Sequence, residues 1–213
     1  MLISVLTPSI RPEGLKIVQE CLSEQTFQDF EWLVELGIPK KGNDLNQAYN
    51  RMLRRAKGEL MVSYQDFIRI KQDGLERFWK AYQDRPDTFF TAPVGKVKNW
   101  DDEPRSDWRT FTENCMWNGW EIDWACAPLQ ALKSLGGFDE ELDEHTWTFD
   151  NVNVGLRAEM AGFKFGCIPT NSARALDHDA FMEHPFRKKY SDTWHNMRLA
   201  EIRRGDFHIP PLT

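Results

Sequence analysis

The sequence predicts one α/β domain in which a mainly parallel central sheet is flanked by helices. Two observations carry this prediction. Short apolar runs of strand length alternate with longer segments in which apolar residues recur at helical spacing. Such segments join parallel strands, because a parallel pair needs a long crossover that is usually a helix. In addition, 213 residues that are 41% hydrophobic and 28% charged can bury one good core.

Strands and helices alternate through the first half of the chain. Four apolar runs predict strands at residues 2–6, 30–34, 60–64 and 88–94. Helices are expected between them, from Pro12 to Leu22, from Asp44 to Gly58 and from Leu75 to Tyr82. Pro12 suits a first helical turn and Gly58 suits a helix end. This order predicts right-handed βαβ units.

The second half of the chain is less regular. Residues 96–124 are rich in Trp, Asp and Asn with weak periodicity, so we expect a loop or an irregular hairpin there. Further on we expect helices at 128–135 and 151–161, a strand at 163–168 and a last helix at about 185–204. No internal repeat or linker is present, so residues 1–213 are expected to form one domain.

Charge and cysteine content exclude several classes of protein. The formal net charge of −6 argues against a surface devoted to nucleic acid, because such domains carry a basic excess. The four cysteines form no C-x-x-C pair, so neither a disulfide framework nor a structural zinc site is expected. No apolar run approaches the roughly 20 residues of a membrane span. We therefore expect a soluble, cytoplasmic protein.

Polar residues follow three of the predicted strands where each strand ends. They are Thr7, Pro8 and Ser9 after the first strand, Glu35 after the second, and Gln65 and Asp66 after the third. Ligands of parallel α/β sheets bind at this edge. A nucleotide diphosphate placed there needs a Mg²⁺- or Mn²⁺-like cation, and Asp66 is the obvious first ligand. A carboxylate at a strand end is equally often a turn former or helix cap, and the residues alone leave both roles open.

Five stretches resemble family 2 glycosyltransferases, in the order and at the spacing of that family. They are ISVLTPSIRPEGLKIVQECLSEQTFQDFEWLV, AYNRMLRRAKGE, LMVSYQDF in the place of the D-x-D motif, LGGFDEEL, and DNVNVGLRAEMAGF. Together they span roughly Ile3 to Ile168. The resemblance implies the GT-A fold, a Rossmann-like α/β fold of nucleotide-diphospho-sugar transferases. It further implies a donor half at about 1–95, an acceptor half at 96–185, and a C-terminal helix and tail at 186–213.

The resemblance implies a donor-binding role for matching residues in the first half. They are Thr7, Pro8, Ser9, Arg11, Glu35, Asn50, Arg51, Gln65 and Asp66. Asp66 lies in the region that holds ribose and metal, and His178 resembles a late histidine that some members use as a metal ligand. The implied cofactor is a divalent cation, Mn²⁺ or Mg²⁺. An exposed helical position for Arg51 and a surface hydrogen bond for His178 are the ordinary alternatives.

The resemblance places the catalytic base in DNVNVGLRAEMAGF. Inverting members use the aspartate of an E-D pair to deprotonate the acceptor hydroxyl. When Arg157 and Gly162 are aligned with the family, the pair is Asp150 and Asn151. Asparagine cannot accept a proton at neutral pH, so we assign Asp150 as the base. Asp150 also suits the N-cap of the helix that follows.

Tryptophans are the expected acceptor contacts, because an aromatic face packs well on the C–H face of a sugar. Trp124 and Trp147, together with Asn151, are the predicted acceptor-binding residues. The expected function is metal-dependent, hexosyltransferase-like transfer of a sugar from a nucleotide-diphosphate donor, expected to be a UDP-sugar, to a hydroxyl with inversion. The acceptor stays open among saccharide, lipid-linked sugar, protein and modified nucleic acid.

Two departures from the family pattern support other functions. Asn151 stands where the family has aspartate, and Gln65 and Phe67 flank Asp66 where carboxylates are common. They motivate a catalytically impaired GT-A module that binds a sugar or nucleotide. A nucleotidyltransferase is a further alternative, but TPSIRPEG is a poor phosphate loop because it is neither Gly-rich nor strongly basic.

Overall fold

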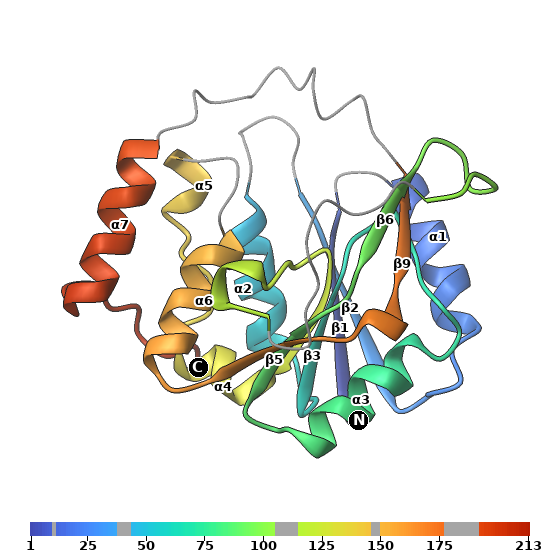
Figure 1. The fold of residues 1–213 in the computed structure, drawn as a ribbon, viewed down its shortest axis with the longest axis horizontal. Coiled ribbons are helices and arrows are strands. Elements are labelled where there is room, and N and C mark those ends of the chain that lie inside the picture. Colours follow the sequence, from blue (N-terminus) through green and yellow to red (C-terminus); the bar gives the residue numbers. More distant parts are fainter. Residues whose placement is uncertain (10–11, 38–43, 105–114, 146–149, 177–191) are drawn as a thin grey trace.

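The computed structural model describes residues 1–9, 12–37, 44–104, 115–145, 150–176 and 192–213. Its centre is a six-stranded sheet with helices on both faces (Figure 1). In sheet order the strands are β2 (Phe30–Leu36), β1 (Ile3–Ser9), β3 (Leu60–Tyr64), β7 (Trp124–Pro128), β5 (Thr88–Thr91) and β8 (Lys164–Cys167). Only β7 is antiparallel to its neighbours, so the other five strands of this sheet share one direction. The predicted mainly parallel sheet is confirmed.

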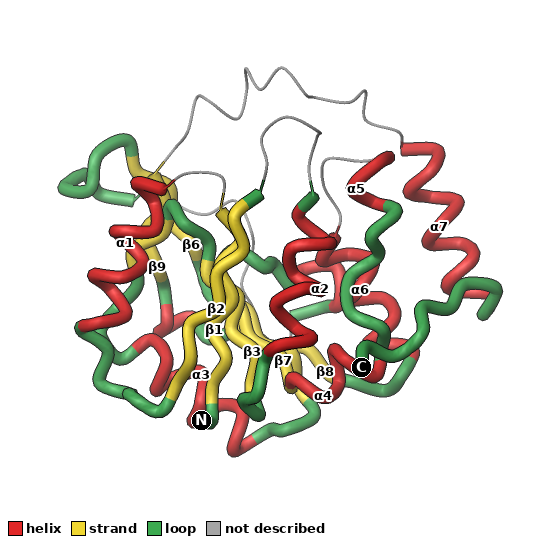
Figure 2. The backbone as a smooth tube through the Cα atoms, turned by 180° about the vertical axis from the view of Figure 1, so that it is seen from behind, coloured by secondary structure: helices red, strands yellow, loops and turns green. Residues whose placement is uncertain are grey.

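Each face of this sheet is covered by its own helices. The helices are α1 (Pro12–Ser23), α2 (Leu45–Arg55), α3 (Gly74–Asp84), α4 (Leu129–Ser134), α5 (Leu142–His145), α6 (Asp150–Met160) and α7 (Asp192–Arg204). Side chains alternate along a strand, so Val5 and Leu6 point to opposite faces. Val5 belongs to the core cluster that includes residues of α1 and α3, whereas Leu6 belongs to the cluster that includes residues of α2, α4 and α6. These two groups of helices lie on opposite sides of the sheet (Figures 1 and 2). None of the described helices is long and apolar enough to cross a membrane.

A small three-stranded sheet lies beside the central one. It consists of β4 (Ile68–Arg69), β9 (Ala173–Leu176) and β6 (Val94–Val97), with β9 in the middle. β4 is antiparallel to β9 and β6 is parallel to it. One face of this sheet joins the core that α1 and α3 cover, through Ile68 and Ala175. The sequence did not predict this sheet.

The predicted strand at 88–94 is in fact two strands in different sheets. β5 ends at Thr91 and β6 begins at Val94, and Pro93 between them has no N–H to donate to a ladder. The central strand β7 was missed altogether, because its short WACAP sequence follows the segment that was expected to be irregular. In the described part of that segment there is one 3₁₀ turn, at Trp117–Gly119. Of the predicted last helix, residues 185–191 lie outside the described residues.

A buried aspartate of α5 fixes the amino end of α2. One oxygen of Asp143 accepts hydrogen bonds from the backbone N–H and the side-chain amide of Asn46, at 3.0 and 2.8 Å. Its other oxygen accepts the backbone N–H of Gln47 at 3.0 Å. These bonds pair backbone donors that the first turn of a helix leaves unpaired. Burial nevertheless raises the pKa of Asp143 to about 6, although the hydrogen bonds act in the opposite direction.

Asp143 is therefore expected to make the stability of the protein pH-dependent. The pKa of Asp143 is 3.8 in the unfolded chain and about 6 in the folded protein. Its contribution to the free energy of unfolding is therefore fully present below about pH 4 and is lost as pH rises through about 6. The loss amounts to about 3 kcal/mol. Urea unfolding between pH 4 and 7 should show the stability advantage of the wild type over Asp143→Asn shrinking by this amount. An advantage that grows with pH would contradict the raised pKa.

Candidate functional site

The carboxyl ends of β1, β2 and β3 meet at one edge of the central sheet. These strands are parallel neighbours, so Ser9, Leu36 and Tyr64 end them on the same side. The amino ends of α2 and α6 lie toward the same end of the molecule (Figures 1 and 2). This is the edge at which the sequence predicts the donor site.

Asp66 lies just beyond β3 and is joined to the end of β1. The hydroxyl of Ser9 donates a hydrogen bond of 2.6 Å to Oδ2 of Asp66, and both residues are buried. Helix α1 packs directly on the backbone here, because a Cβ added to Gly14 would lie 2.4 Å from the carbonyl oxygen of Asp66. Two strands and a helix thus fix the position of this carboxylate.

Thr7 and Pro8 contribute to the edge in different ways. Thr7 is fully buried, and its hydroxyl accepts a hydrogen bond of 2.9 Å from the indole N–H of Trp32 on β2. Pro8 is half-buried and keeps some exposed surface. The sequence did not single out Trp32, because only the pairing of β1 with β2 brings it to Thr7.

Glu35 is held by two arginines of α2. Arg51 Nε and Arg55 Nη2 donate to its two oxygens at 2.9 and 2.6 Å, and Arg51 also pairs with Asp44 at 3.3 Å. The hydrogen bond to Glu35 raises the pKa of Arg51 above its usual value. The family resemblance implies a donor-binding role for both Glu35 and Arg51. In the structure they are partners of each other, and each keeps further hydrogen-bonding capacity for a ligand.

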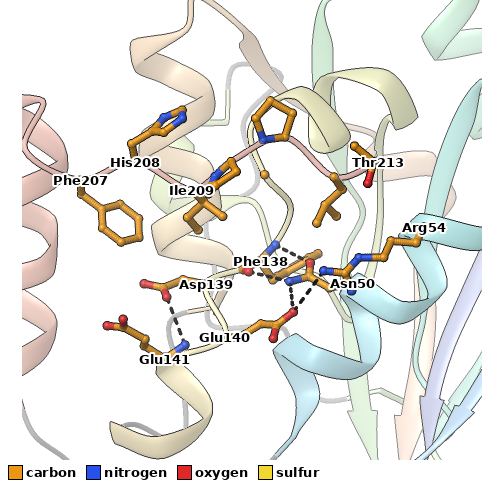
Figure 3. Close-up of a pocket in the computed structure, with 14 residues that line it drawn as sticks. Asn50, Arg54, Phe138, Asp139, Glu140, Glu141, Phe207, His208, Ile209 and Thr213 are labelled. Carbon is orange, nitrogen blue, oxygen red and sulfur yellow. Dashed lines mark hydrogen bonds and ion pairs between the residues drawn. The ribbon is translucent and has the colours of Figure 1, made fainter.

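Asn50 joins α2 to the loop that follows α4 (Figure 3). Its Nδ2 donates to the carbonyl oxygen of Phe138 at 2.9 Å and to Oε1 of Glu140 at 2.8 Å, and its Oδ1 accepts the N–H of Phe138 at 2.8 Å. Both amide donors are therefore used within the protein, and the residue is 2% exposed. Beside it, a cavity of about 420 Å³ lies between this loop and the C-terminal residues (Figure 3). The contacts give Asn50 a structural role, in place of the donor contact that the sequence predicts.

Asn50→Ala is expected to lower the free energy of unfolding by about 2–4 kcal/mol, because it leaves the N–H and C=O of Phe138 buried and unpaired. Urea unfolding measures the change, and Asn196→Ala on the exposed side of α7 is the control, with a change below about 0.5 kcal/mol. UDP affinity should be unchanged while the variant is folded. Weaker UDP binding with full stability would instead restore a donor contact by Asn50.

A short segment before β7 connects the end of β3 with the start of α6. The backbone N–H of Gln65 donates to the carbonyl oxygen of Asp123 at 3.2 Å. The side-chain amide of Asn151 donates to the carbonyl oxygen of Trp120 at 2.9 Å. The three residue steps from Trp120 to Asp123 span at most about 11 Å. Gln65 and Asn151 therefore lie in one region, although they are far apart in the sequence.

This constraint brings together the chain segments that carry the two key carboxylates. Asp66 follows Gln65 directly, and Asp150 directly precedes Asn151. Asp150 is the first residue of α6, and its side chain lies outside what the structure describes. The amino end of a helix favours a negatively charged group. Asn151 is nearly buried, and its amide holds the first turn of α6 against the segment before β7.

Trp124 belongs to the core and not to an acceptor surface. It is fully buried, its indole N–H donates to the carbonyl oxygen of Asn171 at 3.0 Å, and its ring packs against Tyr64 and Phe78. No face of the indole is open to a sugar, so the prediction of an acceptor contact by Trp124 is wrong. The reason is that Trp124 begins a central strand that the sequence did not predict. The predicted site residues outside the described part of the chain are Arg11, Trp147 and His178.

Few of the described residues at this edge offer oxygen ligands for a divalent cation. Among the described residues, no three His, Cys, Asp or Glu side chains lie close enough together to hold a metal ion. Asp66 offers one carboxylate, and the half-buried Gln65 offers an amide oxygen. This set fits Mg²⁺ or Mn²⁺ bound in the way that proteins commonly bind Mg²⁺, through one or two carboxylates and the phosphates of a substrate.

Solved structures with the same fold include complexes with a nucleotide sugar and a nucleotide. Residues 1–349 of S. aureus TarS in complex with UDP-GlcNAc share 15% sequence identity with this chain at a TM-score of 0.69, covering 95% of this chain and 65% of that one. The complex of the same fragment with UDP gives 16% identity and a TM-score of 0.61, covering 97% and 72%. The longer S. aureus TarS structure gives 15% identity and a TM-score of 0.60, and the chain spans 44% of its length.

The likeness to TarS concerns the fold. TarS is a family 2 glycosyltransferase, and the match extends over nearly the whole of this chain. The GT-A fold that the resemblance implies is therefore confirmed. No protein-family model and no curated protein sequence matches this chain.

Proposed function

We propose that this chain binds a UDP-sugar at the edge formed by Ser9 and Asp66 and transfers the sugar to a hydroxyl acceptor. The observation that carries the proposal is the buried hydrogen bond between these residues, at the carboxyl ends of parallel strands. That edge is where α/β sheets bind nucleotides. TarS structures of the same fold are complexes with UDP-GlcNAc and with UDP, which favours uridine as the base.

Asp66 is the residue around which the donor would be arranged. Its carboxylate is preorganised by Ser9 and the close approach of α1, so little reorganisation accompanies the reaction. Together with the amide oxygen of Gln65 it would hold a divalent cation. That cation, when bound, would neutralise the diphosphate. Pro8 offers exposed surface at the same edge to the nucleoside.

Asp150 would act as the general base from the start of α6. It takes the proton of the acceptor hydroxyl while that oxygen bonds to the anomeric carbon. The bond from this carbon to the diphosphate oxygen breaks, and UDP leaves with the electron pair. Attack from the face opposite the diphosphate inverts the anomeric centre. Asn151 supports this arrangement by fixing the first turn of α6 through Trp120.

Donor binding is tested by thermal unfolding with UDP, UDP-GlcNAc and other UDP-sugars, with Mn²⁺ or with EDTA. A bound ligand stabilises the fold by mass action, by about 2.7 kcal/mol at 100 times its Kd. For a chain of this length that corresponds to roughly 5–10 °C in Tm. ADP is the matched control and should give a much smaller shift. Absence of any uridine-dependent shift would contradict the proposal, whereas donor binding without turnover would favour the catalytically impaired module.

A further inference from the structure

A second cavity, of about 490 Å³, lies at the small sheet and is lined by cationic side chains. Arg69 comes from β4, Arg174 from β9, and Lys71 from the turn after β4. The lining includes one carboxylate, that of Glu103. The local excess of positive charge stands out because the whole chain has a net charge of −6. β9 and β6 mark the place of this sheet in Figure 1.

The two arginines face each other across the strand pair. Arg69 and Arg174 are register partners, so their side chains project from the same face of the sheet. Arg174 is also the register partner of Gly95 on β6, which has no side chain to fill the space beside it. The neighbouring register pair, Ile68 and Ala175, faces the core on the opposite side. The alternation of the strands therefore presents both guanidinium groups to the cavity.

The ring of Trp100 and two backbone carbonyl groups position these cations. The guanidinium of Arg69 lies over the ring of Trp100, 4.6 Å from its centroid. Arg174 donates to the carbonyl oxygen of Trp100 at 3.0 Å, and Lys71 donates to the carbonyl oxygen of Thr170 at 2.9 Å. After these contacts each of the three cations still has N–H donors that can bind a ligand.

No carboxylate of the described residues forms an ion pair with any of these three cations. Elsewhere, by contrast, Arg51 and Arg55 pair with Glu35, and Arg198 pairs with Asp139. Two like charges directly opposite each other in a sheet destabilise it. Among the described residues neither arginine has an ion-paired carboxylate, so an anion bound in the cavity would reduce the repulsion between them.

We propose that this cavity binds a phosphate group carried by the acceptor. The proposal rests on the proposed function, because it makes the cavity the anionic subsite of the same reaction. Two guanidinium groups and an ammonium group offer more donors than the two oxygens of a carboxylate can accept, whereas a phosphate presents three or four oxygens. A cavity of about 490 Å³ also leaves room for the group that carries the phosphate.

The position of the cavity fits an acceptor that reaches the donor edge. The N–H of Leu176 on β9 donates to the carbonyl oxygen of Phe67, the residue after Asp66. From Asp66 to Arg69 the chain advances three residues, which span at most about 11 Å. The anion site and Asp66 are therefore close enough along the chain for one acceptor to reach both.

NMR titration of the intact chain tests the anion site directly. Inorganic phosphate, glycerol phosphate and acetate are added at constant ionic strength, and the Nε–Hε signals of Arg69 and Arg174 are followed. Phosphate and glycerol phosphate should shift both signals with one Kd, and acetate should bind about tenfold or more weakly. Equal binding of acetate, or no shift at these arginines, would overturn the phosphate assignment.

Substitutions test whether the two arginines bind the anion specifically or only attract it through their charge. The double variant Arg69→Gln/Arg174→Gln should raise the Kd for glycerol phosphate by about tenfold or more, because charge-assisted hydrogen bonds are lost. Arg203→Gln, an exposed arginine of α7, is the matched control and should leave the Kd unchanged. An equal loss in the control would overturn the proposal. The Tm of each variant reports folding.

UDP binding in the same variants distinguishes the two proposals. The double variant should bind UDP as the wild type does, because the donor edge is built from Ser9 and Asp66. Phosphate binding in the cavity without UDP binding would contradict the proposed function and leave the anion site standing. UDP binding without phosphate binding would contradict the anion site alone.

Discussion

Asp66→Asn is expected to lower the rate of sugar transfer, as kcat/KM, by about 10³-fold or more. Asparagine keeps the shape of the side chain but removes the negative charge that would act on the diphosphate and its cation. Loss of an electrostatic contact of this kind lowers the rates of other enzymes by a similar factor. The carboxylate is buried and bonded to Ser9, so no other side chain replaces it from that position. The rate of UDP release from a UDP-sugar donor measures the loss.

Two further variants make this result specific. Asp84→Asn alters a carboxylate that is 83% exposed and should leave kcat/KM unchanged. Ser9→Ala should have an intermediate effect of about tenfold, because it removes one hydrogen bond that positions Asp66. Full activity of Asp66→Asn with an unchanged Tm would remove Asp66 from the site.

Asp150→Asn is expected to lower kcat by about 10²–10⁴-fold while the Kd for UDP stays the same. The reason is that an amide cannot take the proton of the acceptor hydroxyl. Asparagine remains a good residue at the start of a helix, so α6 and the stability of the fold should be preserved. Single-turnover transfer separates the chemical step from donor binding.

Whether Asp150→Asn changes kcat or the Kd for UDP identifies the role of Asp150. A loss of UDP affinity would assign Asp150 to donor binding instead of proton transfer. Unchanged kcat would move the base elsewhere, and residues outside the described part of the chain would then be the next to test. Asn151 is not a substitute, because its amide is already bonded to the carbonyl oxygen of Trp120.

Much of the fold could be predicted because its signals are local. Apolar runs and helical spacing predicted β1, β2, β3 and β8, together with the described helices other than α5. The rule for the carboxyl ends of parallel strands then pointed to Ser9 and Asp66 together, and the structure joins them by a hydrogen bond. The alternation of strands and helices implies parallel strands, and the carboxyl ends of parallel strands meet at one edge of the sheet.

The features that were not predicted depend on contacts between distant parts of the chain. β7 is recognisable as a strand only once β3 and β5 flank it, and this burial turns Trp124 from a surface candidate into a core residue. The bonds of Asn50 reach Phe138, 88 residues further on. Neither contact has a signature in the local sequence.

The cationic cavity shows the same limit. Arg69 and Arg174 lie on the two sides of a strand pair, β4 and β9, that the sequence did not predict. As isolated positions they are ordinary surface arginines. Their register brings them to one face of the small sheet, where neither forms an ion pair with a carboxylate of the described residues.

The central claim is that one edge of the sheet, marked by the Ser9–Asp66 hydrogen bond, holds the diphosphate of a UDP-sugar. A crystal structure of the chain with UDP-GlcNAc and Mn²⁺ tests it most directly. We predict the diphosphate beside Asp66 and the anomeric carbon facing the first turn of α6, within reach of Asp150. A nucleotide bound elsewhere, with Asp66 still bonded only within the protein, would contradict it.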